Sequence, residues 1–179
     1  NAISDCGKGV DLWVKAHYYS PDGVTWYLCD WYSMDSIMIA WNDITACSGP
    51  AIGTSMSTER ETPITYLTIV GNVVWDSPGA GMLLDRVGYS DVYLNELNSN
   101  GAGIMLYSCA GLKVYHNAIM YNAAQAYDDG GNQWHDGYPS GGNYWSDYTG
   151  VDANMDSIGD TPYLFSVDAQ DPYPLMSPP

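Results

Sequence analysis

Basic residues are scarce in this chain of 179 residues. It has 21 Asp and Glu against only five Lys and Arg, which gives a formal net charge of −16 at pH 7. Proteins that bind nucleic acid use Lys and Arg to neutralise phosphates, and anionic membrane surfaces attract the same side chains. The composition therefore argues against both partners and favours attraction of divalent cations.

Long apolar runs are also lacking. No stretch approaches the roughly 20 residues that a membrane-spanning helix needs, so we expect no membrane insertion. The sequence begins at Asn1, with no initiator Met and no apolar signal-like segment. We therefore expect a mature exported protein, extracellular or at the cell surface, whose signal peptide has been removed.

Phenylalanine occurs once, whereas there are 16 Tyr and seven Trp. Aromatic side chains with a polar group suit half-exposed places such as interfaces, sugar platforms or the outside of a β-solenoid. Simple strand propensity is the alternative explanation.

Four cysteines occur without a Cys-x-x-Cys pair. This pattern favours disulfides in an exported protein over a zinc site, with buried free thiols as the alternative. Two bridges would allow three pairings, and the sequence does not choose among them. The candidates are Cys6, Cys29, Cys47 and Cys109.

A recurrence of 22 residues organises the middle of the chain. The segment Gly79-Ala80-Gly81-Met82-Leu83-Leu84 returns as Gly101-Ala102-Gly103-Ile104-Met105-Leu106, and Asn95 and Asn117 have the same spacing. Short apolar stretches alternate with Gly, Ser, Asn and Asp, and none keeps a helical period. A repeat of this length indicates a solenoid. We predict an all-β parallel β-helix of about four to five coils; a β-sandwich is the competing architecture.

Recurrent asparagines have a physical explanation in such a fold. Asparagine tolerates the left-handed conformation of a tight corner, and stacked amides can bond to their equivalents one rung away. Asn42 to Asn72 spans 30 residues, which predicts an extra surface loop at 54–61. The predicted ladder consists of Asn42, Asn72, Asn95 and Asn117.

Composition divides the chain into three parts. Residues 1–23 form an N-terminal lead-in segment or cap, and residues 24–122 hold the coils. After Asn122 the chain turns to Gly, Asp, Tyr and Trp. We expect residues 123–179 to form an irregular aromatic and acidic cap, because exposed strand edges at a solenoid end otherwise pair with other chains.

The C-terminal part carries a family resemblance. Residues 143–163, beginning Asn-Tyr-Trp-Ser-Asp-Tyr, and the later segment Asp171-Pro172-Tyr173-Pro174-Leu175-Met176 form a specific signature. It resembles that of right-handed parallel β-helix proteins exported by methanogenic archaea, which are related to the periplasmic copper-binding β-helix family that serves nitrous-oxide reductase maturation. With the coils, the resemblance covers residues 24–176. It implies a right-handed β-helix outside the cytoplasm but fixes no activity, because family members differ in role.

The tail contains oxygen ligands at calcium-like spacing. The pattern departs from an EF-hand loop, because Ser157 replaces the turn glycine and Tyr163 stands at the twelfth position. Two interpretations stay open: a Ca²⁺ site, or an acidic loop held by its own side-chain to backbone hydrogen bonds. The candidate ligands are Asp152, Asn154, Asp156, the carbonyl of Ile158, and Asp160.

A continued 22-residue register would stack Asp85, Tyr107 and Asp129 on successive rungs, with Asp128 as a third acid. Carboxylates two rungs apart would be separated by about 9.6 Å, close to the upper separation in inverting glycosidases. Acidic residues are so numerous that chance alignments are common. The sequence also shows no complete set of a nucleophile, a base and a residue that orients the base. We expect no enzyme activity, with a glycan-binding or glycan-hydrolysing β-helix as the alternative.

A copper-binding module is a weaker alternative. His17, His116 and His135 occur with eight Met, and these soft ligands select copper when they cluster. The methionines are scattered, however, and Met82 and Met105 lie where gap-filling strand residues are ordinary.

Tyr93 and Tyr115 should stack one above the other, either to stabilise the sheet or to bind a glycan or another subunit. The predicted interface residues are Tyr93, Tyr115, Trp134, Tyr138, Tyr144, Trp145 and Tyr148. The leading hypothesis is a structural protein of an archaeal cell envelope that assembles with itself into a sheath, surface layer or filament. Apart from Ca²⁺, which could bridge acidic surfaces, we expect no cofactor.

Overall fold

The computed structural model describes residues 1–5, 7–14, 17–19, 27–30, 36–56 and 64–179. All the regular elements in these ranges are β-strands. Among the described residues, no helix is long and apolar enough to cross a bilayer.

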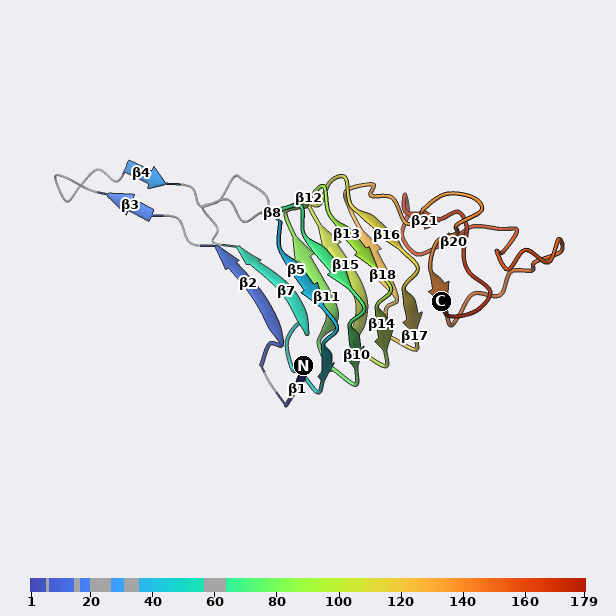
Figure 1. The fold of residues 1–179 in the computed structure, drawn as a ribbon, viewed down its shortest axis with the longest axis horizontal. Helices are drawn as coiled ribbons and strands as arrows, with labels where there is room; N and C mark the ends of the chain where they lie inside the picture. Colours follow the sequence, from blue (N-terminus) through green and yellow to red (C-terminus); the bar gives the residue numbers. More distant parts are fainter. Residues whose placement is uncertain (6, 15–16, 20–26, 31–35, 57–63) are drawn as a thin grey trace.

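Three parallel sheets, named I to III here, make up most of the structure (Figure 1). Sheet I contains β5 (Met38–Ala40), β9 (Thr68–Val70), β13 (Asp91–Tyr93) and β16 (Lys113–Tyr115). Sheet II contains β1 (Ala2–Ser4), β6 (Asp43–Thr45), β10 (Val73–Trp75), β14 (Glu96–Asn98), β17 (Ala118–Met120) and β19 (Tyr144–Trp145). Sheet III contains β2 (Val10–Val14), β7 (Ile52–Met56), β11 (Ala80–Asp85), β15 (Ala102–Tyr107) and β18 (Ala126–Asp128).

Three smaller pairs complete the described elements. One is parallel and two are antiparallel. They are β8 (Ile64–Thr65) with β12 (Val87–Gly88), β3 (His17–Tyr19) with β4 (Tyr27–Asp30), and β20 (Tyr163–Leu164) with β21 (Gln170–Asp171).

The strand register follows the sequence recurrence. Ala80 pairs with Ala102 and Met82 with Ile104, 22 residues apart. The offset between neighbouring rungs is 30 residues at Ile52 and Met82 but 23 at Ile64 and Val87, so the extra residues enter between β7 and β8. Of the predicted loop at 54–61, residues 54–56 belong to strand β7, so that part of the prediction is wrong. Residues 57–61 lie outside the described residues. The all-β, parallel arrangement is consistent with a parallel β-helix.

The sheets extend on both sides of the central repeats. At the N-terminal side, β1 pairs with β6 and β2 with β7. Beyond Asn122, β18 pairs with β15 and β19 pairs with β17. Residues 2–14 and 126–145 therefore contribute strands to the same sheets as the predicted coils.

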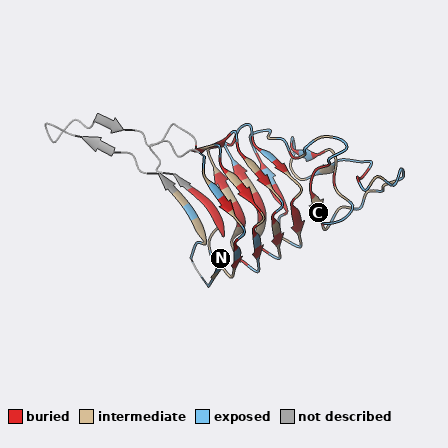
Figure 2. Cartoon of the chain, viewed as in Figure 1, coloured by how far each residue is buried: buried red, intermediate tan, exposed pale blue. Residues whose placement is uncertain are grey.

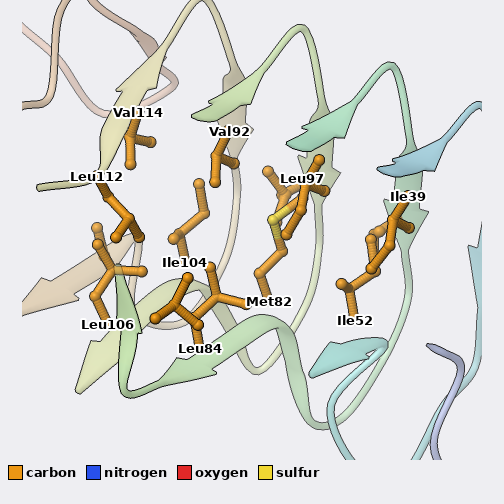
Figure 3. Close-up of a cluster of buried hydrophobic side chains, with 14 of the residues drawn as sticks. Ile39, Ile52, Met82, Leu84, Val92, Leu97, Ile104, Leu106, Leu112 and Val114 are labelled. Carbon is orange, nitrogen blue, oxygen red and sulfur yellow. The ribbon is translucent and has the colours of Figure 1, made fainter. Parts of the chain in front are cut away.

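One apolar core runs through the stacked strands (Figures 2 and 3). Alternate strand residues point inward, so Ile52, Met82 and Ile104 lie one above another in adjacent strands of sheet III and are fully buried. Val92 and Val114 do the same in sheet I. Burying each such side chain contributes about 1.5–3 kcal/mol, so the column is the main source of stability.

A cluster of aromatic rings covers the C-terminal end of this column. The ring centroids of Trp134 and Phe165 are 4.5 Å apart, and those of Trp145 and Tyr163 are 4.3 Å apart. Trp134 and Trp145 are each only 1% exposed. The prediction that these two tryptophans are surface contacts is therefore wrong: the last rung needs apolar cover, and large rings supply it.

Candidate functional site

The predicted asparagine ladder is present. Each Asn Nδ2 donates to the Oδ1 of the asparagine on the next rung, at 2.9 Å from Asn42 to Asn72, from Asn72 to Asn95 and from Asn95 to Asn117. The ladder continues at 2.9 Å from Asn117 to Asn143, which the sequence reasoning missed. These side chains lie inside the stack and are buried. All the amides point in one direction, with their donor ends toward the C-terminal cap.

The asparagines do not occupy the left-handed conformation themselves. The residue before each one does, with φ of 56° at Trp41, 64° at Gly71, 54° at Leu94 and 52° at His116. This corrects our explanation of the corner. Asparagine is required for its hydrogen bonds: Asn95 accepts the backbone N–H of Asn72 at 3.0 Å and donates to the carbonyl of Tyr93 at 3.0 Å.

The ladder ends on a buried carboxylate. Asp171 accepts the backbone N–H of Asn143 at 2.6 Å and its side-chain amide at 3.4 Å. It also accepts the indole N–H of Trp145 and the backbone N–H of Tyr173, both at 3.0 Å. Burial raises the pKa of Asp171, and the hydrogen bonds oppose that shift. The negative charge lies at the donor end of the aligned amide dipoles, which it complements.

A shorter ladder ends in the same way. Asn100 Nδ2 donates to Asn122, Asn122 donates to Gln125, and Gln125 donates to Asp147 at 3.1 Å. The Tyr163 hydroxyl also donates to Asp147, at 2.9 Å. Burial and this carboxylate both raise the pKa of Tyr163.

Asp128, one of the three predicted catalytic acids, is held by donors from the turn that follows it. Its carboxylate accepts the backbone N–H groups of Gly130 and Asn132, the Asn132 amide, and the indole N–H of Trp134 at 2.9 Å. Asp128 is buried. Four donors hold this carboxylate, so its geometry is that of a structural cap.

The other two predicted acids lie on sheet III and at its end. Asp85 pairs in register with Tyr107 and has the Arg86 guanidinium 3.8 Å away. Asp129 accepts the backbone N–H of Ser108 at 2.7 Å. A hollow of about 300 Å³ lies beside Asp129, with Tyr127, Ser166 and Asp168 in its wall. Their use in catalysis stays a prediction.

The acidic tail loop is folded around its own backbone. Asp152 accepts the N–H groups of Asp156 and Ser157, and Asp156 accepts that of Ile158 at 2.9 Å. Asp160 accepts the N–H of Ala153 at 2.8 Å. Hydrogen bonding to the Ile158 N–H is the largest cause of a lowered pKa at Asp156. These contacts match the hydrogen-bonded interpretation; Ca²⁺ binding there stays a prediction.

The described histidines have hydrogen-bond partners of their own. His116 Nε2 is 2.8 Å from the Ser140 carbonyl, and His135 Nδ1 accepts the Gly137 N–H at 2.9 Å. Met82 is in the core, whereas Met38 and Met155 are exposed. No group of three or more His, Cys, Asp or Glu in the described ranges is arranged to hold a metal. The His17 side chain lies outside them.

The structure does assemble one polar cluster that sequence reasoning missed. The Ser140 hydroxyl donates to Asp136 at 3.0 Å and lies 3.2 Å from His116 Nε2. The serine is thus oriented by the carboxylate, while the imidazole faces the Ser140 carbonyl. Nucleophilic catalysis needs the serine to donate to the imidazole, whereas this hydroxyl donates to Asp136.

The cysteines do not form two bridges from the four candidates. Cys109 is a buried free thiol whose Sγ lies 3.4 Å from the carbonyl oxygens of Leu84 and Tyr107. Its predicted role in a disulfide is therefore wrong: the side chain packs inside the stack. Cys47 is disulfide-bonded; Cys6 and the Cys29 side chain lie outside the described residues.

Cys109 should be chemically inert in the folded protein. Burial raises its pKa to about 11, so little of the reactive thiolate exists near neutral pH. We expect iodoacetamide at pH 8 to leave Cys109 unmodified in buffer and to modify it in denaturant, as measured by peptide mass spectrometry. Fast labelling in buffer would contradict the buried placement.

Tyrosines stack from rung to rung on the outside. Tyr93 and Tyr115 are nearly parallel, with ring centroids 5.2 Å apart, as predicted. A second stack joins Tyr66 and Tyr89 at 6.2 Å, and a third joins Tyr107 and Tyr127 at 5.1 Å. Of the remaining interface candidates, Tyr138 is exposed, and Tyr144 and Tyr148 are half-buried.

The comparison with protein families supports this architecture. The family described as "Periplasmic copper-binding protein (NosD)" matches residues 31–150. No curated protein and no solved structure matches the chain. The matched region covers most of sheets I to III, and a periplasmic family is consistent with an exported protein. The chain therefore belongs to the NosD family of parallel β-helix proteins.

Proposed function

We propose that the protein is a non-enzymatic structural protein outside the cytoplasm, which assembles with itself as a sheath, surface-layer or filament subunit. The C-terminal resemblance supports an archaeal cell envelope. The observation that carries the proposal is the outer surface: tyrosine side chains stack from rung to rung there, exposed at Tyr66 with Tyr89 and at Tyr107 with Tyr127, and half-buried at Tyr93 with Tyr115. Contiguous exposed apolar surface is characteristic of interaction sites.

The interior supports the same conclusion. Asparagine and glutamine side chains at the corners bond to neighbouring rungs, and the two ladders end on Asp171 and Asp147. A polar network satisfied in this way rigidifies a structure. The polar side chains inside the stack thus stabilise the fold, and a rigid fold suits a subunit of a structural assembly.

Sedimentation velocity of the purified protein tests the proposal. We expect the mean sedimentation coefficient to rise with protein concentration. Adding Ca²⁺ should strengthen the effect if it bridges the acidic surfaces. A protein that remains monomeric at high concentration, both with and without Ca²⁺, would contradict self-assembly.

Copper binding is the second candidate, favoured by the family match. Imidazole is a suitable copper ligand, and His116 and His135 are the described histidines. Metal analysis of native material tests this function directly. Bound copper that is lost from a His116→Ala, His135→Ala variant would favour it.

A glycan-binding or glycan-hydrolysing activity is the remaining alternative. Asp85 and Asp129 are the acids that it would use. Sugar release that is abolished by Asp85→Asn and Asp129→Asn would favour it, whereas a structural protein has no such activity to lose.

A further inference from the structure

The outer side of sheet I carries a group of exposed or half-buried aromatic and apolar residues, here named the tyrosine face. Two corners border it, each formed by residues with positive φ. Tyr66 and Tyr89 stand at one corner and are 61% and 68% exposed, while Trp41 stands at the other and is 69% exposed. The tyrosine face consists of Met38, Trp41, Tyr66, Tyr89, Tyr93, Leu94 and Tyr115.

The strands and corners of this face carry few charges, and the Asp136 carboxylate lies close enough to contribute, after burial and Asp91, to a raised pKa of Tyr115. The outward positions of its four strands include one acid, Asp91, and one base, Lys113, which are partners in the strand register. The two corners carry no Asp, Glu, Lys or Arg: one contains Ser36, Tyr66, Tyr89 and Gly111, the other Trp41, Gly71, Leu94 and His116.

Sheet II differs in charge. Its outward positions include Asp43 and Glu96 with no base. On sheet III, Asp11 and Asp85 each have a base nearby, Lys8 at 2.8 Å and Arg86 at 3.8 Å. Two copies with a net charge of −16 each repel one another. They can approach most closely through the face that carries least of this charge.

We propose that the tyrosine face pairs with the tyrosine face of a second copy of this chain. In a two-fold arrangement, the same patch is used on both subunits. Lys113 of each copy can then meet Asp91 of the other, while the exposed tyrosines bury their rings against each other. This interface rests on the proposed self-assembly and names the surface through which it occurs.

The test is a Tyr66→Asn, Tyr89→Asn double variant studied by sedimentation equilibrium. Asparagine tolerates the positive φ of 57° and 48° at these positions, so the fold should be preserved. Exposed aromatic residues dominate many interfaces, and we expect the dissociation constant of the pair to rise at least about tenfold.

Tyr121→Asn is the matched control. Tyr121 is 71% exposed and has a positive φ of 53°, but it lies at a different corner, after β17. We expect this variant to associate like the parent protein. Lys113→Asp should weaken association about tenfold, and adding Asp91→Lys should restore it.

The outcomes separate the interface from the proposed function. Unchanged association in the double variant would overturn the tyrosine face while leaving self-assembly intact. A parent protein that is monomeric throughout would overturn both. The third outcome is a parent protein that is monomeric and migrates more slowly in gels containing a neutral polysaccharide, while the double variant does not. This result would show that the tyrosine face binds glycan, and it would overturn the pairing.

Discussion

Replacing Asp171 by alanine is expected to lower the free energy of unfolding by about 3 kcal/mol. The change leaves the backbone N–H groups of Asn143 and Tyr173 and the indole N–H of Trp145 without their acceptor. Each unsatisfied buried donor costs about 1–3 kcal/mol, and relief from burying a charge offsets part of the sum.

Thermal unfolding followed by circular dichroism measures this effect. A loss of about 3 kcal/mol should lower the Tm by roughly 6–12 °C in a domain of this size. Asp168→Ala is the control, because Asp168 is exposed in the same segment. Equal Tm values for the two variants would show that Asp171 does not anchor the cap.

Replacing Asn95 by alanine is expected to cost slightly more, roughly 3–4 kcal/mol. Asn95 lies in the middle of the ladder, so its loss removes bonds on both sides. The N–H and Nδ2 of Asn72 lose their acceptor. Oδ1 of Asn117 loses one of its two donors and keeps the backbone N–H of residue 95. Water cannot readily replace these bonds because the three side chains are at most 1% exposed.

Urea unfolding of Asn95→Ala and Asn98→Ala measures this difference. Asn98 lies three residues further on, on the outer side of sheet II, where its Oδ1 accepts from the neighbouring Ser99 hydroxyl. Its replacement should change the free energy of unfolding by less than about 0.5 kcal/mol. A comparable loss in both variants would mean that the ladder adds nothing beyond ordinary side-chain packing.

The repeat was visible in the sequence because residues that pair in neighbouring stacked strands are separated by one full coil, so equivalent residues recur at a constant interval. Asn95 and Asn117 recur after 22 residues, and the structure joins their side chains. Asn143 follows Asn117 after 26 residues, and Asp171 replaces the amide by a carboxylate. The longer interval hid Asn143, and the change of residue type hid Asp171, because the ladder was predicted from asparagines at regular intervals.

The tryptophans show where composition misleads. Trp134 and Trp145 lie in a segment with almost no aliphatic residues, which favoured a surface position. In the structure they pack over the C-terminal end of the apolar core. Their indole N–H groups donate to Asp128 and Asp171. Sequence alone does not show that a polar partner is available inside the cap.

The roles of the three candidate catalytic acids were also difficult to predict, because the sequence does not show their hydrogen-bond partners. Asp85, Asp128 and Asp129 look alike as residue types, and spacing places them near one another. Only the hydrogen-bond partners separate Asp128, held by four donors, from acids with few contacts. Likewise, the exposed Tyr66 and Tyr89 became recognisable as one surface only once their strands were placed side by side.

Electron microscopy of native material tests the central claim most directly. The proposed structural role predicts ordered polymers, as sheets, tubes or filaments, whose repeating unit fits the β-helix of this chain. Dispersed single particles in native material, with no ordered assembly under any condition that preserves the fold, would contradict it.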